Sequence, residues 1–292
     1  MMIELIKKML HKNYYIVAVI RPNSPNYFRI IPLKDQIRII ELEMSNYTEL
    51  SGMIEEDFDL CYYFSWNGVR GKERDCELLQ RGNYLAYESF TNSIKEKVKR
   101  FIGIGSWAEY GQSDLRMCEE IETNPMTWYG KYKQKCCMYG QEVAKSSHME
   151  FVWARIFSLY GPGDYEGSLI MNLCKNMLRN ENVDLSKCEH VWNYLYVTDA
   201  AELLFRLGVN TSVTGIYNIA SAESRVLKDY ILEIKKLTNS ESNLNFGAVT
   251  SSNINMRPSL DKLQYAIGKI SEVTFEDGIF KVIEIMYKEG KV

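Results

Sequence analysis

A tyrosine and a lysine in the middle of the chain have the types and spacing needed to move a proton at an alcohol or a ketone. Tyr129 and Lys133 lie four residues apart in a segment that we predict to be helical, so both side chains project from one helix face. A lysine ammonium beside a phenol favours the phenolate and lowers the pKa of the tyrosine from about 10. Such a tyrosine can take or give a proton near neutral pH, while Ser106, at the end of a predicted strand, holds the same substrate oxygen.

The spacing alone is a weak signal, since the chain contains three tyrosines that are followed four residues later by a lysine. The other two are Tyr265 and Tyr287. Only Tyr129 opens a helix between two predicted strands and has a strand-end serine upstream. For Tyr129 and Lys133 taken alone, the alternative is a solvated helix face. The context favours a hydride-transfer site formed by Ser106, Tyr129 and Lys133.

Short apolar runs alternate with helical patterns along the chain, and this alternation must position the three side chains. Strands are predicted at residues 14–20, 37–42, 59–66, 100–104 and 150–157. Long helices are predicted at about residues 73–99 and 123–146, the second with Thr123 as N-cap and Pro125 in its first turn. Such alternation is typical of a doubly wound parallel α/β sheet with helices on both faces. Ligands bind these sheets beyond the carboxyl ends of the strands, where Ser106 is expected.

The composition is that of an ordinary folded protein, with 46% hydrophobic and 25% charged residues among 292. A net charge of −3 gives no electrostatic reason to expect a nucleic acid or an anionic membrane as partner. The seven cysteines form no C-x-x-C pair, which favours free thiols in a reducing compartment; a cysteine nucleophile is the weaker alternative. No apolar run reaches the length of a membrane span, so we expect a cytoplasmic protein, and we expect no bound metal.

Longer stretches of recognisable sequence surround the three residues. They read RFIGIGSWAEYG at 100–111, NPMTWYGKYK at 124–133 and RIFSLYGP at 155–162. Further stretches are WNYLYVTD at 192–199, GIYNI at 215–219 and FEDGI at 275–279. These stretches occur in the same order in the extended short-chain dehydrogenases, and the chain resembles that family from about residue 1 to 288. The family comprises NAD(P)-dependent epimerases, dehydratases and reductases of nucleotide sugars.

The resemblance implies a Rossmann-type sheet and a smaller C-terminal α/β domain. The NAD(P)-binding domain would comprise residues 1–160 plus 190–223, and the substrate domain residues 161–189 plus 224–292. A nucleotide sugar is the implied substrate. A homodimer formed through helices that include the Tyr129 helix is the implied assembly.

The resemblance also implies roles for single residues. Tyr129 corresponds to the acid/base, Lys133 to the partner that holds the nicotinamide ribose, and Ser106 to the hydroxyl that orients the reacting oxygen. Residues expected at the cofactor are Arg21, Phe64, Ser65, Tyr129, Lys133 and Ile156. Residues expected at the substrate are Ser106, Trp107, Ser158 and Arg257. Asn83 matches an asparagine in the helix behind the site.

The largest departure from the family lies at the start of the chain. No glycine precedes Gly52, so the family's first strand and the glycine-rich turn that binds the pyrophosphate are absent. Two explanations stay open. Either the native protein starts upstream of Met1, or the chain is a truncated relative that binds cofactor poorly and exposes strand edges. At the next strand end Arg21 replaces an acidic residue, which favours NADP over NAD.

Two further departures narrow the reaction. The family's 4,6-dehydratases carry Thr-Asp-Glu where this chain has Ser106, Trp107 and Ala108, which argues against dehydration. Glu109 comes one position later and, in an extended segment, should point away from the site. The arginine that often binds the diphosphate is replaced at 192–193 by Trp-Asn, and Arg257 is a candidate replacement.

We therefore predict an NAD(P)-dependent nucleotide-sugar epimerase or 4-ketoreductase. A non-catalytic binding or regulatory protein that kept the fold is the alternative from another class; the missing glycines favour it and the intact site residues oppose it. A reductase of non-sugar ketones is a third interpretation.

Overall fold

The strands of the main sheet are mostly apolar segments buried on both faces. The computed structural model describes residues 1–112, 115–250, 254–269 and 272–292. Its main sheet has four parallel strands in the order β10, β5, β4, β3. They span Gly215–Ile219 (β10), Glu150–Ile156 (β5), Arg100–Ser106 (β4) and Cys61–Tyr63 (β3). Every residue of β4 is buried, which explains why this strand lacks an alternating polar pattern.

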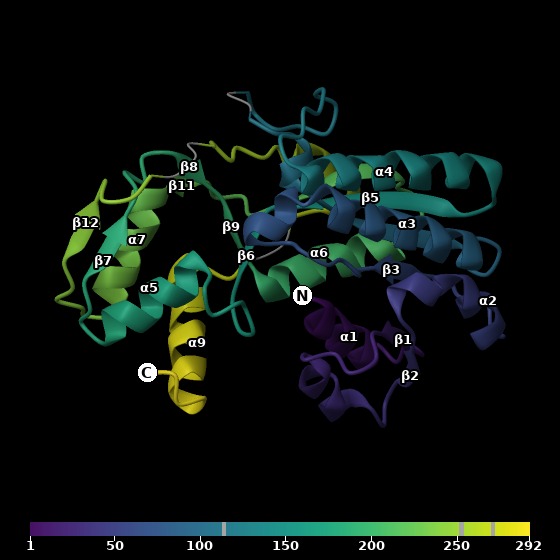
Figure 1. The fold of residues 1–292 in the computed structure, drawn as a ribbon, viewed down its shortest axis with the longest axis horizontal. Helices are drawn as coiled ribbons and strands as arrows, with labels where there is room; N and C mark the ends of the chain where they lie inside the picture. The colour runs from purple at the N-terminus through teal and green to yellow at the C-terminus, as the bar shows by residue number, and fades with distance from the viewer. Residues whose placement is uncertain (113–114, 251–253, 270–271) are drawn as a thin grey trace.

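Helices cover both faces of this sheet (Figure 1). On one face, α3 (Glu77–Ile94) and α4 (Trp128–Ser146) share a core with Phe101 of β4. On the other face, α6 (Val197–Val209) shares a core with Ile102. Successive side chains of a strand point to opposite faces, so these two neighbours contribute to different cores. The arrangement confirms the predicted parallel α/β sheet.

The first part of the chain forms a separate unit around a two-stranded parallel sheet. The helix α1 (Met2–His11) is followed by β1 (Val17–Ile20) and β2 (Arg38–Glu41). Within the described ranges, these two strands pair only with each other. The unit has a small core of its own, made of Ile6, Ile16, Ala18, Ile30, Leu33 and Ile37. It contacts the rest of the molecule through α1, which packs on α6, and through β2, whose Ile40 belongs to the same core as α3.

An apolar cleft of about 180 Å³ lies between this unit and the main sheet. Its walls carry side chains of β1, of β3 and of α1, among them Val19, Tyr62 and Leu5. In the part of the chain that the structure describes, no strand lies between β1 and β3, so each has an edge without a ladder partner. The cleft therefore lies between two strand edges that are not paired with each other.

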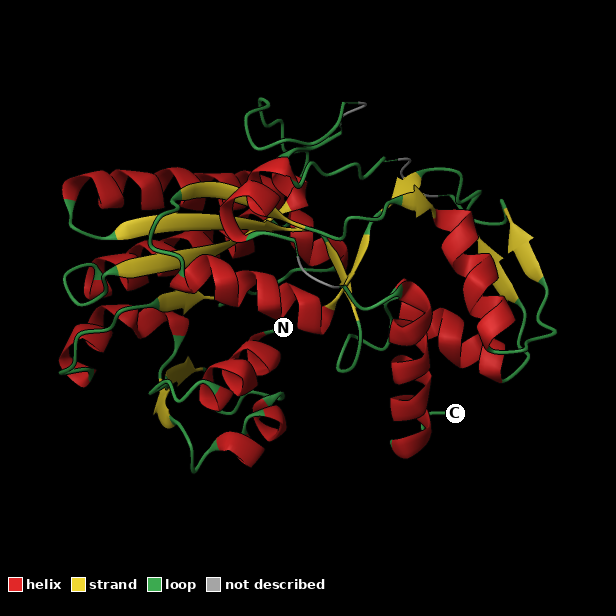
Figure 2. Ribbon diagram, turned by 180° about the vertical axis from the view of Figure 1, so that it is seen from behind, coloured by secondary structure: helices red, strands yellow, loops and turns green. Residues whose placement is uncertain are grey.

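A smaller lobe lies beside the carboxyl ends of the main sheet (Figure 2). Its core is shared by α5 (Leu169–Leu178), α7 (Leu227–Leu237) and α9 (Phe275–Lys288). Short strand pairs accompany it: β6 (Ser158–Tyr160) with β9 (Tyr194–Tyr196), β8 (Val191–Trp192) with β11 (Arg225–Val226), and β7 (Val183–Leu185) with β12 (Leu244–Phe246). The helix α8 (Asp261–Ile267) falls within the predicted substrate domain but packs on α6 and β10 of the main sheet's side. The predicted domain boundaries stay a prediction.

The start of α4 differs from the expectation. Its N-cap is Thr127, whose hydroxyl accepts a hydrogen bond from Gly130 N at 3.2 Å, and not Thr123. Asn124 N donates to Tyr110 O at 3.2 Å, so the segment before the helix is held against the end of the preceding loop. Because this tertiary contact delays the helix, Pro125 precedes the first turn.

The remaining expectations concern thiols, membranes and metals. All seven cysteines are free thiols, and Cys136, Cys137, Cys174 and Cys188 are buried. Among the described residues, no helix combines the length and apolar character needed to cross a membrane. Those residues also contain no group of three or more acidic, histidine or cysteine side chains suited to a metal ion.

Candidate active site

The end of β4 fixes the position of Ser106. This residue caps a short 3₁₀ helix, Trp107–Glu109, by accepting a hydrogen bond from Ala108 N at 3.2 Å. In return, the Glu109 carboxylate accepts from Ser106 N at 2.8 Å, which completes a capping box. The serine is thereby held at the carboxyl edge of the sheet. The segment is helical and not extended, but Glu109 still turns away from the cavity described below.

A buried ion pair lies directly beneath the serine. Glu109 is fully buried and accepts hydrogen bonds from Arg155 Nε at 2.9 Å and from Trp153 Nε1 at 3.0 Å. Arg155 is only 4% exposed, and its guanidinium stacks at 4.5 Å on the Tyr110 ring. The carboxylate therefore accepts from Ser106 N, Trp153 Nε1 and Arg155 Nε, and it is fully engaged in holding the end of β4.

The first turns of α4 bring the tyrosine and the lysine to the serine. Gly130 makes this approach possible, since a Cβ atom there would lie 2.4 Å from Ala108 O. Lys133 Nζ donates to Ile104 O at 2.7 Å and lies 5.9 Å from the centre of the Tyr129 ring. The Tyr129 hydroxyl is in hydrogen-bonding reach of Ser106, and its ring meets Trp66 edge-on at 5.9 Å.

The pKa shifts at the site differ from the expectation. Burial raises the pKa of Tyr129 above its usual 10, and the Ser106 hydrogen bond and the Arg74 charge counteract this rise. Lys133 does not contribute, because its ammonium bonds Ile104 O and sits 3.7 Å from the Trp66 ring. Burial also lowers the pKa of Lys133 to about 8. Tyr129 and Lys133 lie together as expected, but the lysine does not lower the pKa of the tyrosine, and Arg74, which lies outside every recognisable motif, was not predicted.

A cavity of about 550 Å³ opens at the carboxyl ends of β3, β4 and β5. Of the residues expected from the sequence, it brings together Phe64, Ser106, Trp107, Tyr129, Lys133, Ile156 and Ser158. This is the edge at which ligands bind in open parallel sheets.

Three expected residues lie elsewhere. Ser65 shares a hydrogen bond of 2.9 Å with the Tyr47 hydroxyl and lines the apolar cleft between β1 and β3. Arg21 is exposed just beyond β1, where it donates to Asn67 Oδ1 at 3.4 Å. Arg257 is exposed and lines neither the cleft nor either of the two larger cavities.

Asn83 acts behind the site, as expected. Its amide donates to Asn67 O at 2.8 Å and accepts from Asn67 N at 2.9 Å. It therefore fixes the loop that follows β3 and carries Trp66 against Lys133.

The residues present fit part of a dinucleotide. Phe64 and Ile156 provide apolar walls beside the Lys133 amino group, which suits a nicotinamide and its ribose. Met1 lines the same cavity, and no side chain caps α1, so the N–H groups of its first turn are available to a phosphate.

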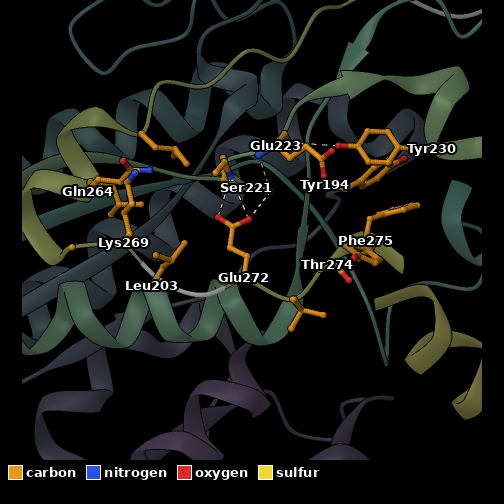
Figure 3. A pocket seen from close by; sticks show the side chains of 17 residues that line it. Tyr194, Leu203, Ser221, Glu223, Tyr230, Gln264, Lys269, Glu272, Thr274 and Phe275 are labelled. Atoms are coloured by element: carbon orange, nitrogen blue, oxygen red, sulfur yellow. Dashed lines mark hydrogen bonds between the residues drawn. The ribbon is translucent and has the colours of Figure 1, made fainter. Parts of the chain in front are cut away.

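A second cavity, of about 510 Å³, lies between the end of β10 and the smaller lobe (Figure 3). Glu272 points to Ser221 there and accepts hydrogen bonds from Ser221 Oγ at 2.6 Å and Ala222 N at 3.0 Å. None of the three candidate catalytic side chains lines this cavity.

The family model described as "NAD dependent epimerase/dehydratase family" matches residues 4–220. The chain belongs to this family. It is 23% identical over 178 residues to the ADP-L-glycero-D-manno-heptose-6-epimerase of Nitratidesulfovibrio vulgaris, covering 56% of this chain and 54% of that protein. It is 25% identical over 226 residues to the dTDP-4-dehydro-6-deoxyglucose reductase of Escherichia coli, covering 76% and 71%.

Family membership agrees with the fold. The structure of UDP-glucuronic acid 4-epimerase from Bacillus cereus, in complex with UDP-glucuronic acid and NAD, superposes with a TM-score of 0.80 at 18% identity. That likeness covers 98% of this chain and 96% of the other, and it supports the fold alone. The chain spans about half the length of the heptose epimerase that it matches in sequence.

Proposed function

We propose that this protein is an NAD(P)-dependent nucleotide-sugar epimerase or 4-ketoreductase. The observation that carries the proposal is the meeting of Ser106, Tyr129 and Lys133 in one cavity at the carboxyl edge of the sheet. Family membership and relatives named as an epimerase and a deoxysugar reductase support it.

In this mechanism Tyr129 exchanges a proton with the oxygen at the reacting carbon. When bound, the nicotinamide supplies or accepts the hydride. Ser106 holds the reacting oxygen, and its own position is fixed by the capping box with Glu109. Lys133 has a pKa of about 8 and is mostly protonated at neutral pH, and its ammonium, held by Ile104 O, is the group that would bind the nicotinamide ribose. The serine thus provides orientation, the tyrosine proton transfer and the lysine a contact to the cofactor.

Dehydration is disfavoured because the acid and base for water elimination are missing. Trp107 and Ala108 follow the serine, and the next carboxylate, Glu109, is buried in its pair with Arg155. What remains is oxidation and reduction of a sugar hydroxyl.

The finer assignments are also proposals. An exposed Arg21 beyond β1 supports NADP over NAD. Exposed apolar side chains on α3 and α4, Leu78, Leu85 and Met138, support a homodimer through these helices. Seven free thiols support the cytoplasm as the compartment.

A non-catalytic binding protein is the second candidate, and the cleft between β1 and β3 is the observation that favours it. Cofactor affinity separates the two. Calorimetric titration of the full chain with NADPH and NADH should give micromolar binding, with circular dichroism confirming that the chain is folded. A panel of nucleotide sugars should then be turned over by the wild type and not by Tyr129→Phe. A folded chain without cofactor affinity or turnover would support the binding protein.

A further inference from the structure

Arg74 brings an unneutralised positive charge to the candidate active site. It belongs to the 3₁₀ turn Gly71–Asp75 that precedes α3, and it lines the cavity of Ser106 and Tyr129. Its guanidinium lies 4.8 Å from the centre of the Tyr129 ring and 5.8 Å from that of Trp107. Among the residues that the structure describes, none forms an ion pair with it, and its Nε is buried without an acceptor.

The other cations of the cavity are already engaged. Arg70 pairs with Asp164 at 3.3 Å and stacks on the Tyr165 ring at 4.8 Å. Lys133 donates to Ile104 O. Arg74 differs because the aromatic rings beside it attract a cation but offer no acceptor to its N–H groups.

A second buried donor without an acceptor lies across the same cavity. Trp192 lines the cavity, and its Nε1 finds no partner in the described part of the chain. Its ring meets that of Trp107 at 6.1 Å, so Trp107 lies between the two unsatisfied donors. Both residues line the cavity and carry N–H donors, which favours a ligand with oxygen acceptors.

The position of Arg74 selects the part of the ligand that it contacts. It stacks on the ring of Tyr129, the proposed acid/base, so the group that it binds lies close to the reacting carbon. The planar guanidinium matches a carboxylate with two parallel hydrogen bonds. We propose that Arg74 is a specificity-determining residue that binds a carboxylate on the sugar, so that the substrate is a nucleotide-linked uronic acid. This inference rests on the proposed function of the same site.

The test compares ligands that differ at one group. UDP-glucuronic acid carries a carboxylate where UDP-glucose carries a hydroxymethyl group. UDP, the third ligand, has no sugar. Calorimetric titration of the full chain with each of these three ligands gives three affinities. The measurement does not depend on turnover, and the difference between the two sugar nucleotides is the contribution of the carboxylate to the affinity. We expect the wild type to bind UDP-glucuronic acid at least about tenfold more tightly than UDP-glucose, since hydrogen bonds between charged groups are the stronger ones.

Variants of two arginines in the same cavity distinguish a specific contact between Arg74 and the carboxylate from a general effect of positive charge on binding. Arg74→Gln should abolish the preference and leave affinity for UDP-glucose and UDP unchanged, and Arg74→Lys should restore part of it. Arg70→Gln is the matched control and should keep the preference, because the charge of Arg70 is already paired with Asp164.

Three outcomes would overturn the inference. Equal affinity for the two sugar nucleotides in the wild type would do so, as would a preference that survives Arg74→Gln. Weaker binding of UDP itself to Arg74→Gln would assign Arg74 to the diphosphate instead. In all three cases the nucleotide-sugar function stands, whereas failure of the UDP ligands and of ADP- and dTDP-linked sugars alike to bind the folded chain would overturn that function together with this inference.

Discussion

The buried carboxylate of Glu109 holds the end of β4, and its removal should be among the most damaging single changes in the molecule. Glu109→Ala would leave Ser106 N, Trp153 Nε1 and Arg155 Nε without their acceptor. Arg155 is 4% exposed, so its charge cannot be solvated in place. Removing one partner of a buried ion pair costs about 3–5 kcal/mol. A domain is typically stable by only about 5–15 kcal/mol, so we expect a loss of about 4 kcal/mol to remove between about a quarter and four fifths of the stability.

Urea unfolding followed by circular dichroism measures this loss as a lower midpoint at unchanged slope. Adding Arg155→Met should recover part of the lost stability, because the double variant no longer buries an unpaired charge. The control is Asp59→Asn, which breaks a pair with Lys99 whose side chains are 86% and 77% exposed; we expect no measurable change. A loss below about 1 kcal/mol in Glu109→Ala, or strict additivity in the double variant, would refute the reasoning.

Three further predictions concern the site and the cleft. Tyr129→Phe should lower turnover by about 10²–10⁴-fold with an unchanged unfolding midpoint, as measured in substrate assays and urea unfolding; turnover near the wild-type level would exclude Tyr129 as the acid/base. The pKa of Lys133 is about 8 in the folded chain against 10.5 when unperturbed, so unfolding takes up a proton between these values. The free energy of unfolding of the wild type should therefore rise by about 3 kcal/mol relative to that of Lys133→Met as the pH increases through this window. If the free energies of unfolding of the two proteins changed in parallel with pH, this would contradict the burial of the lysine charge. Fusing an apolar strand and a glycine-rich turn ahead of Met1 should raise the Tm by several degrees and tighten NADPH binding; a polar segment of equal length is the control, and equal effects of both would count against strand insertion.

The main elements were predictable because the sheet is buried on both faces. Strands such as β4 and β5 are mostly apolar and alternate with long helices, so their order and the parallel sheet follow from the sequence. The meeting of Ser106 with Tyr129 and Lys133 was predictable for the same reason, since a strand end and the next helix meet at the carboxyl edge.

What the sequence did not predict depends on contacts between distant segments. Phe64 lines both the active-site cavity and the cleft, whereas Ser65 lines the cleft alone, because neighbouring residues of an extended segment point to opposite sides. Burial raises the pKa of Tyr129, and tertiary packing directs the Lys133 ammonium to Ile104 O and the Trp66 ring. Arg74 sits in a short 3₁₀ turn without any periodic pattern, so only the folded chain reveals what it touches.

The separate core of α1, β1 and β2 has a consequence for the order in which the molecule opens. This unit is attached through α1, which packs on α6 and carries an ion pair between Lys8 and Glu202, and through Ile40 of β2, which belongs to the neighbouring core. Units with few contacts to the rest exchange their amide hydrogens first, because local opening costs less than global unfolding. The uncapped end of α1 also faces the cavity where a phosphate would bind. A cofactor that contacts this end would hold closed the part of the molecule that opens most readily, so its measured affinity would include the free energy of ordering that part.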